Sequence, residues 1–211
     1  MKRLFALFLF VLPALNVFSQ KDPEATKVLD KFSAIAAAAP SVSMKFTLVT
    51  IDQAEGTNKS SDGSLVLKKD KYWLDLGDNI IWYNGEVSWS YLTTEKEVTI
   101  NKPDKKDNSF QARPSSVFSI YRKGYKTRLI DEKADSYLID LYPEDLNADN
   151  IRIRLKIGKP SYDLKSIEYK YKNGTIVTLS VKEYDLKRKP DDSLFIFPSD
   201  KYKGADVIDI R

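Results

Sequence analysis

The residues that could perform chemistry in this chain are carboxylates, because the 211-residue sequence contains no histidine and no cysteine. Without these residue types the chain cannot form a Ser-His-Asp or Cys-His nucleophilic site, and zinc lacks its usual ligands. The glycines are isolated turn residues, so no glycine-rich phosphate-binding loop follows a strand. The composition therefore excludes most of the common catalytic sites.

Two carboxylates that face each other in a cleft can hydrolyse a glycosidic bond. Asp75, Glu86 and Asp140 are candidates for such a pair. Each of them falls on an expected strand or turn, where a solvated surface position is the more common role. A carboxylate-dependent hydrolase is therefore the weakest of the functions considered, and we expect that the protein is not an enzyme.

A second acidic group consists of Asp52, Glu55 and Asp62, in a stretch rich in Ser, Thr and Asn. Its spacing does not match that of an EF-hand calcium loop. Across the whole chain 34 basic and 30 acidic residues are interspersed, which is typical of a solvated surface and not of a nucleic-acid interface. We expect no metal site, no cofactor and no nucleic-acid partner.

The N-terminal residues have the pattern of a secretory signal peptide. Lys2 and Arg3 precede an apolar stretch that ends near Leu15, and Val17 and Ser19 occupy positions −3 and −1 of a cleavage site. The apolar stretch is too short to span a bilayer comfortably. We therefore expect residues 1–19 to be removed and residues 20–211 to form one exported domain, most simply a soluble periplasmic protein without cysteine lipidation.

The strongest strand pattern lies in residues 63–100, where apolar and polar residues alternate on both sides of Asn84-Gly85. Asn and Gly both tolerate positive φ, so this pair predicts a tight type I′ hairpin turn. All three tryptophans, Trp73, Trp82 and Trp89, fall in this window. Such an apolar load suggests a sheet that covers apolar material, more than a core of its own.

The rest of the chain adds two helices and further strands. Asp22-Pro23 begins an amphipathic helix that ends before Pro40, and a second helical piece runs from Pro114 to Tyr121. Alternating segments continue to Tyr184, with another hairpin at Asn173-Gly174. The sequence predicts a mainly β protein, a large twisted antiparallel sheet or partial barrel of about ten or eleven strands, with the two helices over its open face.

Several short motifs follow one another along the mature chain. They are Phe46-Thr47, Gly63-x-Leu65 before Lys68 and Lys69, the segment Asn84-Gly85-Glu86-Val87-Ser88-Trp89-Ser90-Tyr91, Phe195-x-Phe197-Pro198, and Gly204-Ala205-Asp206-Val207-Ile208-Asp209. In this order, and together with the signal peptide and the layout of two helices and many strands, they resemble the LolA family of periplasmic carriers of outer-membrane lipoproteins. The resemblance covers essentially the whole mature chain.

The resemblance implies an unclosed β-barrel whose apolar concave face is covered by a helical lid and shields the acyl chains of a lipoprotein. It also implies an inner-membrane ABC transporter of the Lol type as donor and an outer-membrane acceptor, and we expect the carrier to be a monomer. On this basis the expected cavity lining consists of Phe46, Leu48, Leu65, Leu67, Leu74, Trp89, Tyr91, Val98, Ile100, Val117, Phe118 and Tyr121.

Two departures from the family pattern bear on the lid. The family commonly has Gln where this chain has Leu48, and members carry an Arg shortly afterwards, whereas residues 46–62 contain no Arg. A latch between lid and barrel must therefore use other groups. The alternation also leaves open which strand faces are concave. The main alternative function is a sensor or interaction module on the same half-barrel, which binds lipidated envelope proteins without transporting them.

Overall fold

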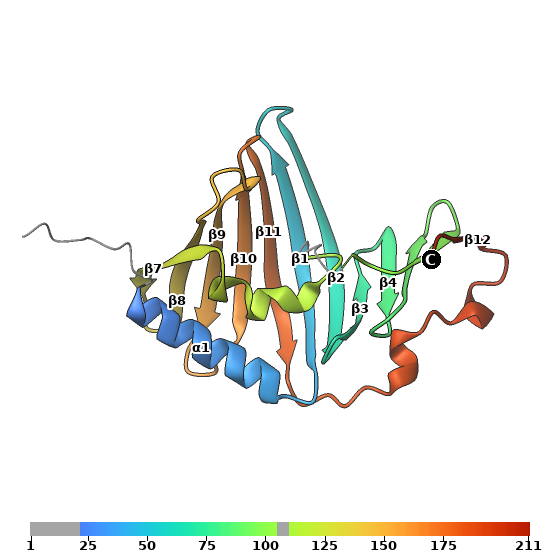
Figure 1. Ribbon diagram of the computed structural model, residues 1–211, viewed down its shortest axis with the longest axis horizontal. Helices are drawn as coiled ribbons and strands as arrows, with labels where there is room; N and C mark the ends of the chain where they lie inside the picture. The colour runs from blue at the N-terminus through green and yellow to red at the C-terminus, as the bar shows by residue number, and fades with distance from the viewer. Residues whose placement is uncertain (1–21, 105–109) are drawn as a thin grey trace, which may run out of the picture.

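The computed structural model describes residues 22–104 and 110–211 of the chain (Figure 1). The expected signal peptide, residues 1–19, lies outside the described residues, as does part of the polar loop at 101–108. Within the described ranges the chain forms one α-helix, four short 3₁₀ helices and twelve strands of a single sheet. None of the described helices is long and apolar enough to cross a membrane.

The secondary structure elements have the following bounds. The helices are α1 (Pro23–Ala38), η1 (Pro114–Phe118), η2 (Ile120–Arg122), η3 (Asp192–Phe195) and η4 (Ser199–Lys201). The strands are β1 (Val42–Asp52), β2 (Thr57–Lys68), β3 (Lys71–Asp75), β4 (Asn79–Tyr83), β5 (Ser88–Leu92), β6 (Glu97–Asn101), β7 (Tyr125–Glu132), β8 (Ser136–Pro143), β9 (Asn150–Gly158), β10 (Leu164–Tyr171), β11 (Thr175–Asp185) and β12 (Asp206–Asp209).

The sheet is open, with the strand order β12-β6-β5-β4-β3-β2-β1-β11-β10-β9-β8-β7. Neighbouring strands are antiparallel except β12, which runs parallel to β6. The edge strands β7 and β12 do not pair with each other, so the barrel is not closed, as predicted. The described residues form twelve strands, which is more than the ten or eleven that the sequence predicts. One additional strand is β12, which lies in the exposed tail. All four of its side chains are exposed, so its sequence has no alternation that would predict a strand.

The turn between β4 and β5 differs from the predicted two-residue hairpin. Tyr83 pairs with Ser88, so the connection has four residues. The Asn84 Oδ1 atom accepts hydrogen bonds from the backbone N–H groups of Glu86 (2.9 Å) and Val87 (2.8 Å), and of the two turn residues only Gly85 has a positive φ. The type I′ prediction is wrong because the Asn84 side chain satisfies the loop amides in a wider turn.

Helix α1 begins and ends where the sequence predicts. Asp22 caps its N-terminus: its Oδ1 atom accepts from the N–H groups of Glu24 (2.9 Å) and Ala25 (3.2 Å). The Oδ2 atom of the same side chain accepts from the N–H of Leu129 at 2.9 Å, on the edge strand β7. One carboxylate therefore caps the helix and also fixes it to the edge of the sheet, and its apolar stripe is buried around Phe32.

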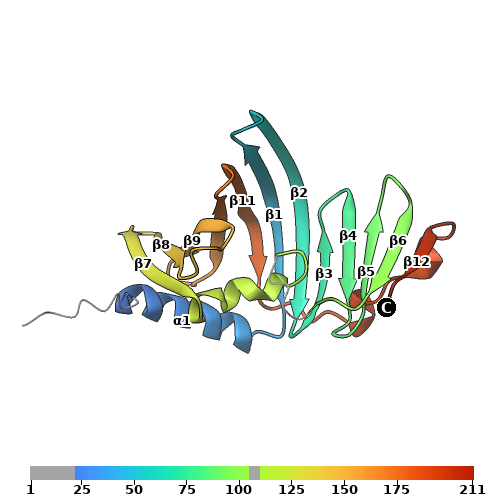
Figure 2. The same ribbon diagram turned by 45° about the horizontal axis from the view of Figure 1, so that its top comes forward.

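The second predicted helix consists of two 3₁₀ turns, η1 and η2. They are buried through Val117, Phe118 and Tyr121, and the Phe118 ring lies 5.0 Å from that of Phe32, centroid to centroid. Both views show α1 and these turns on the same side of the curled sheet (Figures 1 and 2). We call the side of the sheet that they cover the inner face and the opposite side the outer face.

The described residues form two apolar cores. The larger one lies on the inner face, between the sheet and α1, η1 and η2. The smaller one lies on the outer face, where Trp82, Tyr91 and Val98 pack against Phe197 and Tyr202 from the segment after η3. Trp73, Trp82 and Trp89 are directly opposite one another on β3, β4 and β5, so all three indole rings belong to the outer face.

Candidate functional site: an apolar cavity with a tyrosine rim

The inner face contains a cavity of about 310 Å³. It is bounded by five strands, β1, β7, β9, β10 and β11, and by residues 110–122, a segment that crosses the sheet and that we call the roof segment. The cavity is lined by Leu48, Phe110, Ile120, Tyr125, Asp149, Asn150, Ile153, Ile167, Tyr169, Tyr171, Val177 and Leu179. Its volume lies at the lower end of the range of roughly 300 to 1,000 Å³ that small-molecule sites span.

The apolar wall of the cavity follows from strand register. Leu48 on β1 lies opposite Leu179 on β11, which in turn lies opposite Ile167 on β10. Val177 and Ile153 occupy the next inward positions on β11 and β9, with Tyr169 between them. Because side chains alternate between the two faces of a strand, these apolar residues form one continuous surface.

Five polar side chains line the cavity, those of Tyr125, Asp149, Asn150, Tyr169 and Tyr171, and we call this group the rim. The Tyr125 hydroxyl donates to the Oδ1 atom of Asn150 at 3.5 Å, and the rings of Tyr169 and Tyr171 stack 6.4 Å apart. Burial raises the pKa of the Tyr169 phenol and, to a smaller degree, that of Tyr171, so both hydroxyls are uncharged near neutral pH.

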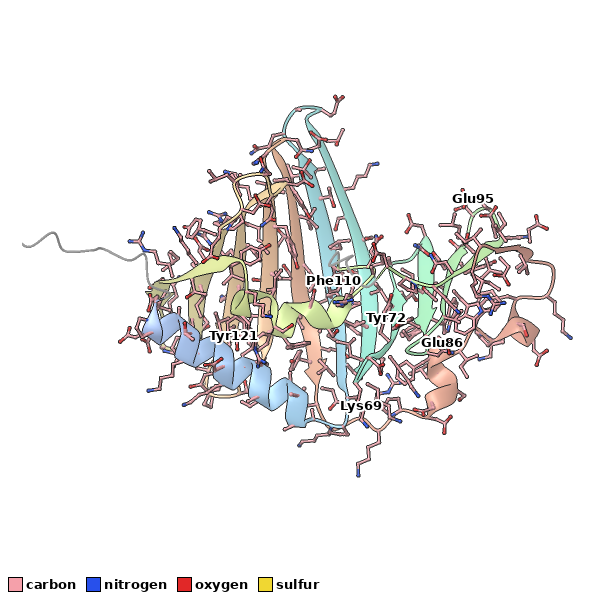
Figure 3. The ribbon with its side chains drawn as sticks, in the orientation of Figure 1. Lys69, Tyr72, Glu86, Glu95, Phe110 and Tyr121 are labelled. Atoms are coloured by element: carbon pink, nitrogen blue, oxygen red, sulfur yellow. The ribbon has the colours of Figure 1, made fainter. Side chains whose placement is uncertain are left out.

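The roof segment begins above Phe46 and Tyr72. The Tyr72 hydroxyl donates to the carbonyl oxygens of Gln111 (2.9 Å) and Ala112 (3.2 Å), and the Phe110 ring meets that of Phe46 edge to face at 6.2 Å. Figure 3 shows Tyr72 and Phe110 where this segment crosses the sheet. Phe46 itself fits because Gly63, its partner on β2, has no side chain.

The other end of the roof segment is fixed to α1. The Tyr121 hydroxyl donates to Asp30 Oδ1 at 2.6 Å, and Nη2 of Arg122 donates to the hydroxyl of Ser33 at 3.0 Å. These contacts place Ile120, which directly precedes them in sequence, over the cavity. The chain thus has polar contacts between lid elements and sheet that do not require an Arg within residues 46–62.

Eight of the twelve expected lining residues lie in the inner-face core, and one of these, Leu48, lines the cavity. Leu67 and Phe118 line a separate cavity of about 360 Å³ beside the C-terminal end of α1. The remaining five members of the core fill its interior; they are Phe46, Leu65, Leu74, Val117 and Tyr121. The structure thus brings the eight side chains together, but most of them are packed in the interior of the core.

The other four expected residues require a correction, because Trp89, Tyr91, Val98 and Ile100 do not share a surface with the first eight. Tyr91 and Val98 belong to the outer-face core with Trp89 packed against them, and Ile100 lies opposite Trp89. On β5 the inward positions are those that alternate with Trp89 and Tyr91, namely Ser88, Ser90 and Leu92. The four expected residues point outward, where the C-terminal segment, distant in sequence, packs on the sheet.

The cavity residues that the sequence interpretation missed come mainly from β9, β10 and β11. Their alternation was visible, notably Ile153 and the pair Tyr169 and Tyr171. Alternation identifies an apolar face but does not show which part of that face a covering segment leaves uncovered. A cluster of tyrosines at the ends of adjacent strands was the one available signal.

The acidic residues considered above do not meet in a cleft. Asp140 lies on the outer face and binds Arg154 with both oxygens, at 2.7 and 2.8 Å. Asp75 accepts from the N–H of Gly77, and Glu86 lies 3.8 Å from Lys102 in an exposed ion pair. These three carboxylates therefore have separate structural surroundings.

Asp62, which the sequence placed in a turn with Asp52 and Glu55, lies instead on the long strand β2. Its Oδ1 atom accepts from Lys182 at 2.8 Å and from the Thr47 hydroxyl at 2.9 Å, and these donors hold the pKa of Asp62 below its usual value. No group of three or more His, Cys, Asp or Glu side chains suited to a metal ion occurs among residues 22–104 and 110–211.

The site of this chain is thus an apolar cavity on one face of an open, curled sheet, and concave, mostly apolar cavities are the usual binding sites of small molecules. The family model described as "Outer membrane lipoprotein carrier protein LolA" matches residues 15–175. The chain therefore belongs to the LolA family, as the order of its motifs predicts. That description is of a carrier, which is a binding role and not a catalytic one.

A solved structure shows the same fold: an uncharacterized conserved protein from Thermus thermophilus has 12% identity and a TM-score of 0.59, with 89% of this chain and 99% of that chain covered. Two others are less similar. A putative outer membrane lipoprotein-sorting protein domain from Vibrio parahaemolyticus has 10% identity and a TM-score of 0.45, with coverages of 85% and 98%. A LolA superfamily protein from Nitrosomonas europaea has 11% identity and a TM-score of 0.43, with coverages of 82% and 97%. No curated protein matches the sequence.

Proposed function

We propose that this protein is a periplasmic carrier that binds an acyl chain of a lipoprotein in the inner-face cavity. The observation that carries the proposal is the continuous apolar wall of Leu48, Ile153, Ile167, Val177 and Leu179 beneath the roof segment. Burial of one CH₂ group is worth about 0.8 kcal/mol. An acylated protein therefore stays in the membrane unless a carrier replaces the lipid environment with an apolar wall of this kind.

The roof segment supplies the means of entry and release. It consists of short 3₁₀ turns, which are not stable as isolated helices and depend on their contacts with α1 and the sheet. The cavity of about 310 Å³ has the volume of a small ligand site and accommodates at most one chain. Displacement of the roof segment from the sheet would extend the cavity along the inner face and admit further chains.

In this role the protein has two membrane partners of different kinds. An inner-membrane ABC transporter of the Lol type loads the carrier, and an outer-membrane acceptor receives the cargo. Membership of the LolA family supports this assignment. The carrier acts as a monomer, because each copy contains a complete cavity and roof segment.

A second candidate function is an interaction module that binds a lipidated envelope protein without transporting it. The observation that favours it is that the protein's own side chains fill most of the inner face, where Phe46, Leu65 and Leu74 are fully buried. The two functions differ in release: a carrier transfers its bound lipoprotein to acceptor membranes, whereas an interaction module retains it.

The test of the cavity compares two tryptophan substitutions at neighbouring positions. Val177→Trp places an indole ring in the cavity, whereas Thr178→Trp places the same ring on the outer face of β11. We expect the first variant to lose binding of a fluorescent acyl probe at least tenfold and the second to bind like the wild type. Equal binding by both variants, or no binding by the wild type, would contradict the proposal.

A further inference from the structure

We infer that the cavity selects an acyl chain joined through a neutral ester or amide, and that the Asn150 side-chain amide donates a hydrogen bond to the carbonyl oxygen of that linkage. This inference rests on the proposed function, because it specifies the chemistry of the ligand in the same cavity. It concerns the polar end of the chain, whereas the apolar wall concerns its hydrocarbon part.

The first observation is a buried donor without an acceptor. The Oδ1 atom of Asn150 accepts from Tyr125, which leaves its Nδ2 amide as the free end of the side chain. This Nδ2 atom is buried and has no hydrogen-bond partner among the described residues. An unmet donor of this kind destabilises a folded protein, and native structures contain few of them. A carbonyl oxygen at the rim would supply the missing acceptor.

The second observation is the charge of the rim. Asp149, next to Asn150, is the charged residue in the cavity lining, and the described lining contains neither Lys nor Arg. The other polar side chains there, those of Tyr125, Tyr169 and Tyr171, carry hydroxyl groups and no cation. A free fatty acid would bring its carboxylate close to Asp149 with no cation to compensate the repulsion. A neutral ester or amide avoids this cost.

Together these observations define which end of the ligand lies at the rim. The hydrocarbon chain lies along Leu48, Ile167 and Leu179, and the linkage lies at the rim near Asn150. Diacylglyceryl and N-acyl groups on a protein have this chemistry, as do neutral glycerolipids. A free fatty acid is not neutral, and an ether-linked chain has no carbonyl oxygen, so each lacks one of the two required properties.

The experiment measures displacement of a fluorescent acyl probe by four competitors of equal chain length: an ester-linked monoacylglycerol, its ether analogue, the free fatty acid and a triacylated lipopeptide. For the wild type we expect the ester and the lipopeptide to bind about tenfold more tightly than the ether, a factor that corresponds to about 1.4 kcal/mol. Stronger binding of the lipopeptide than of the ester would identify a protein cargo, and equal binding a glycerolipid.

Two variants separate the two parts of the inference. Asn150→Leu removes the donor at similar volume and is expected to abolish the difference between ester and ether, whereas Asn147→Leu, in the preceding exposed loop, should retain it. Asp149→Asn is expected to improve binding of the fatty acid severalfold near neutral pH. Thermal unfolding of each variant checks that it is folded.

The possible failures are distinguishable. If no acyl compound displaces the probe from the wild type, the proposed function fails together with the inference. If the ester and ether bind equally to the wild type, or if Asn150→Leu retains the wild-type ratio, only the inference about the linkage is overturned. Tight binding of the fatty acid by the wild type would overturn the argument from charge.

Discussion

The indole ring of Trp82 meets the ring of Phe197 edge to face on the outer face of the sheet, with ring centroids 5.3 Å apart and planes at 77°. Trp82 is 4% exposed, and Tyr202 packs on the same indole ring at 5.6 Å. The aromatic strands β3–β5 are therefore covered by the chain's own C-terminal segment. The outward-facing aromatic side chains of these strands stabilise the fold on the side opposite the cavity.

Because the contact between Trp82 and Phe197 lies on the face opposite the cavity, we expect a substitution there to lower stability without changing the affinity for an acyl ligand. Phe197→Ala should lower the free energy of unfolding by about 1 to 3 kcal/mol, because it removes a half-buried ring from a packed cluster. Acyl-probe affinity at low temperature should stay within twofold of the wild-type value. Urea denaturation and probe titration measure the two effects, and a large loss of affinity in the folded variant would show that the outer face contributes to binding.

Because Gly63 lies opposite Phe46, we expect that position 63 does not tolerate a side chain. A Cβ atom at Gly63 would lie 2.5 Å from the Phe46 ring and 2.8 Å from the carbonyl oxygen of Asp75. We expect Gly63→Ala to destabilise the protein by about 1 to 3 kcal/mol. The double variant with Phe46→Leu should cost less than the sum of the two single changes, because one of the two clashes disappears. Additive free energies of unfolding would contradict this interpretation.

Asp22 gives a pH-dependent contribution to stability. The hydrogen bond from the Leu129 N–H, followed by those from Ala25 and Glu24, lowers the pKa of Asp22 below its ordinary value. The unfolded chain therefore binds more protons at acidic pH, and this contribution is fully present above about pH 4 and lost as the pH falls through the lower pKa of the folded state.

The matched variants are Asp22→Asn, which keeps an acceptor for the helix cap but cannot titrate, and Asp22→Ala, which removes the cap. We expect the alanine variant to lose about 1 to 2 kcal/mol near neutral pH. The asparagine variant should lose less stability than the wild type between about pH 5 and pH 3. Parallel stability curves for wild type and Asp22→Asn over this range would refute the role of the carboxylate charge.

The outer-face ion pair of Asp140 and Arg154 predicts a cost for removal of one partner. Asp140 is 1% exposed, and besides Arg154 it receives a hydrogen bond from the Tyr142 hydroxyl at 3.0 Å. Arg154→Leu leaves the buried carboxylate with one donor, so we expect a loss of about 2 to 3 kcal/mol. The double variant Asp140→Leu, Arg154→Leu should be more stable than the single one, and a less stable double variant would disprove the explanation.

Local signals predicted the elements of this fold well. Asp22-Pro23 marks the start of α1, Pro40 follows its end, and strand alternation predicts the strands of both halves of the sheet. The open sheet with a covered inner face also agrees with the prediction. These features depend on neighbours within a few residues, which the sequence displays directly.

The location of the cavity could not be predicted in the same way. The same alternation describes Trp89 and Leu65, yet Trp89 faces outward because Phe197 and Tyr202 pack on that side, more than a hundred residues later in the chain. The cavity wall and the filled core have equally apolar patterns, and the path of the roof segment decides which residues stay uncovered. Contacts distant in sequence therefore determine the site.

The most direct test of the central claim is native mass spectrometry of the purified protein after incubation with a triacylated lipopeptide. The account predicts a one-to-one complex for the wild type and for Thr178→Trp, and a free protein mass for Val177→Trp. If the wild type carries no acylated molecule and takes up no lipopeptide, the inner-face cavity does not bind acyl chains and the account is wrong.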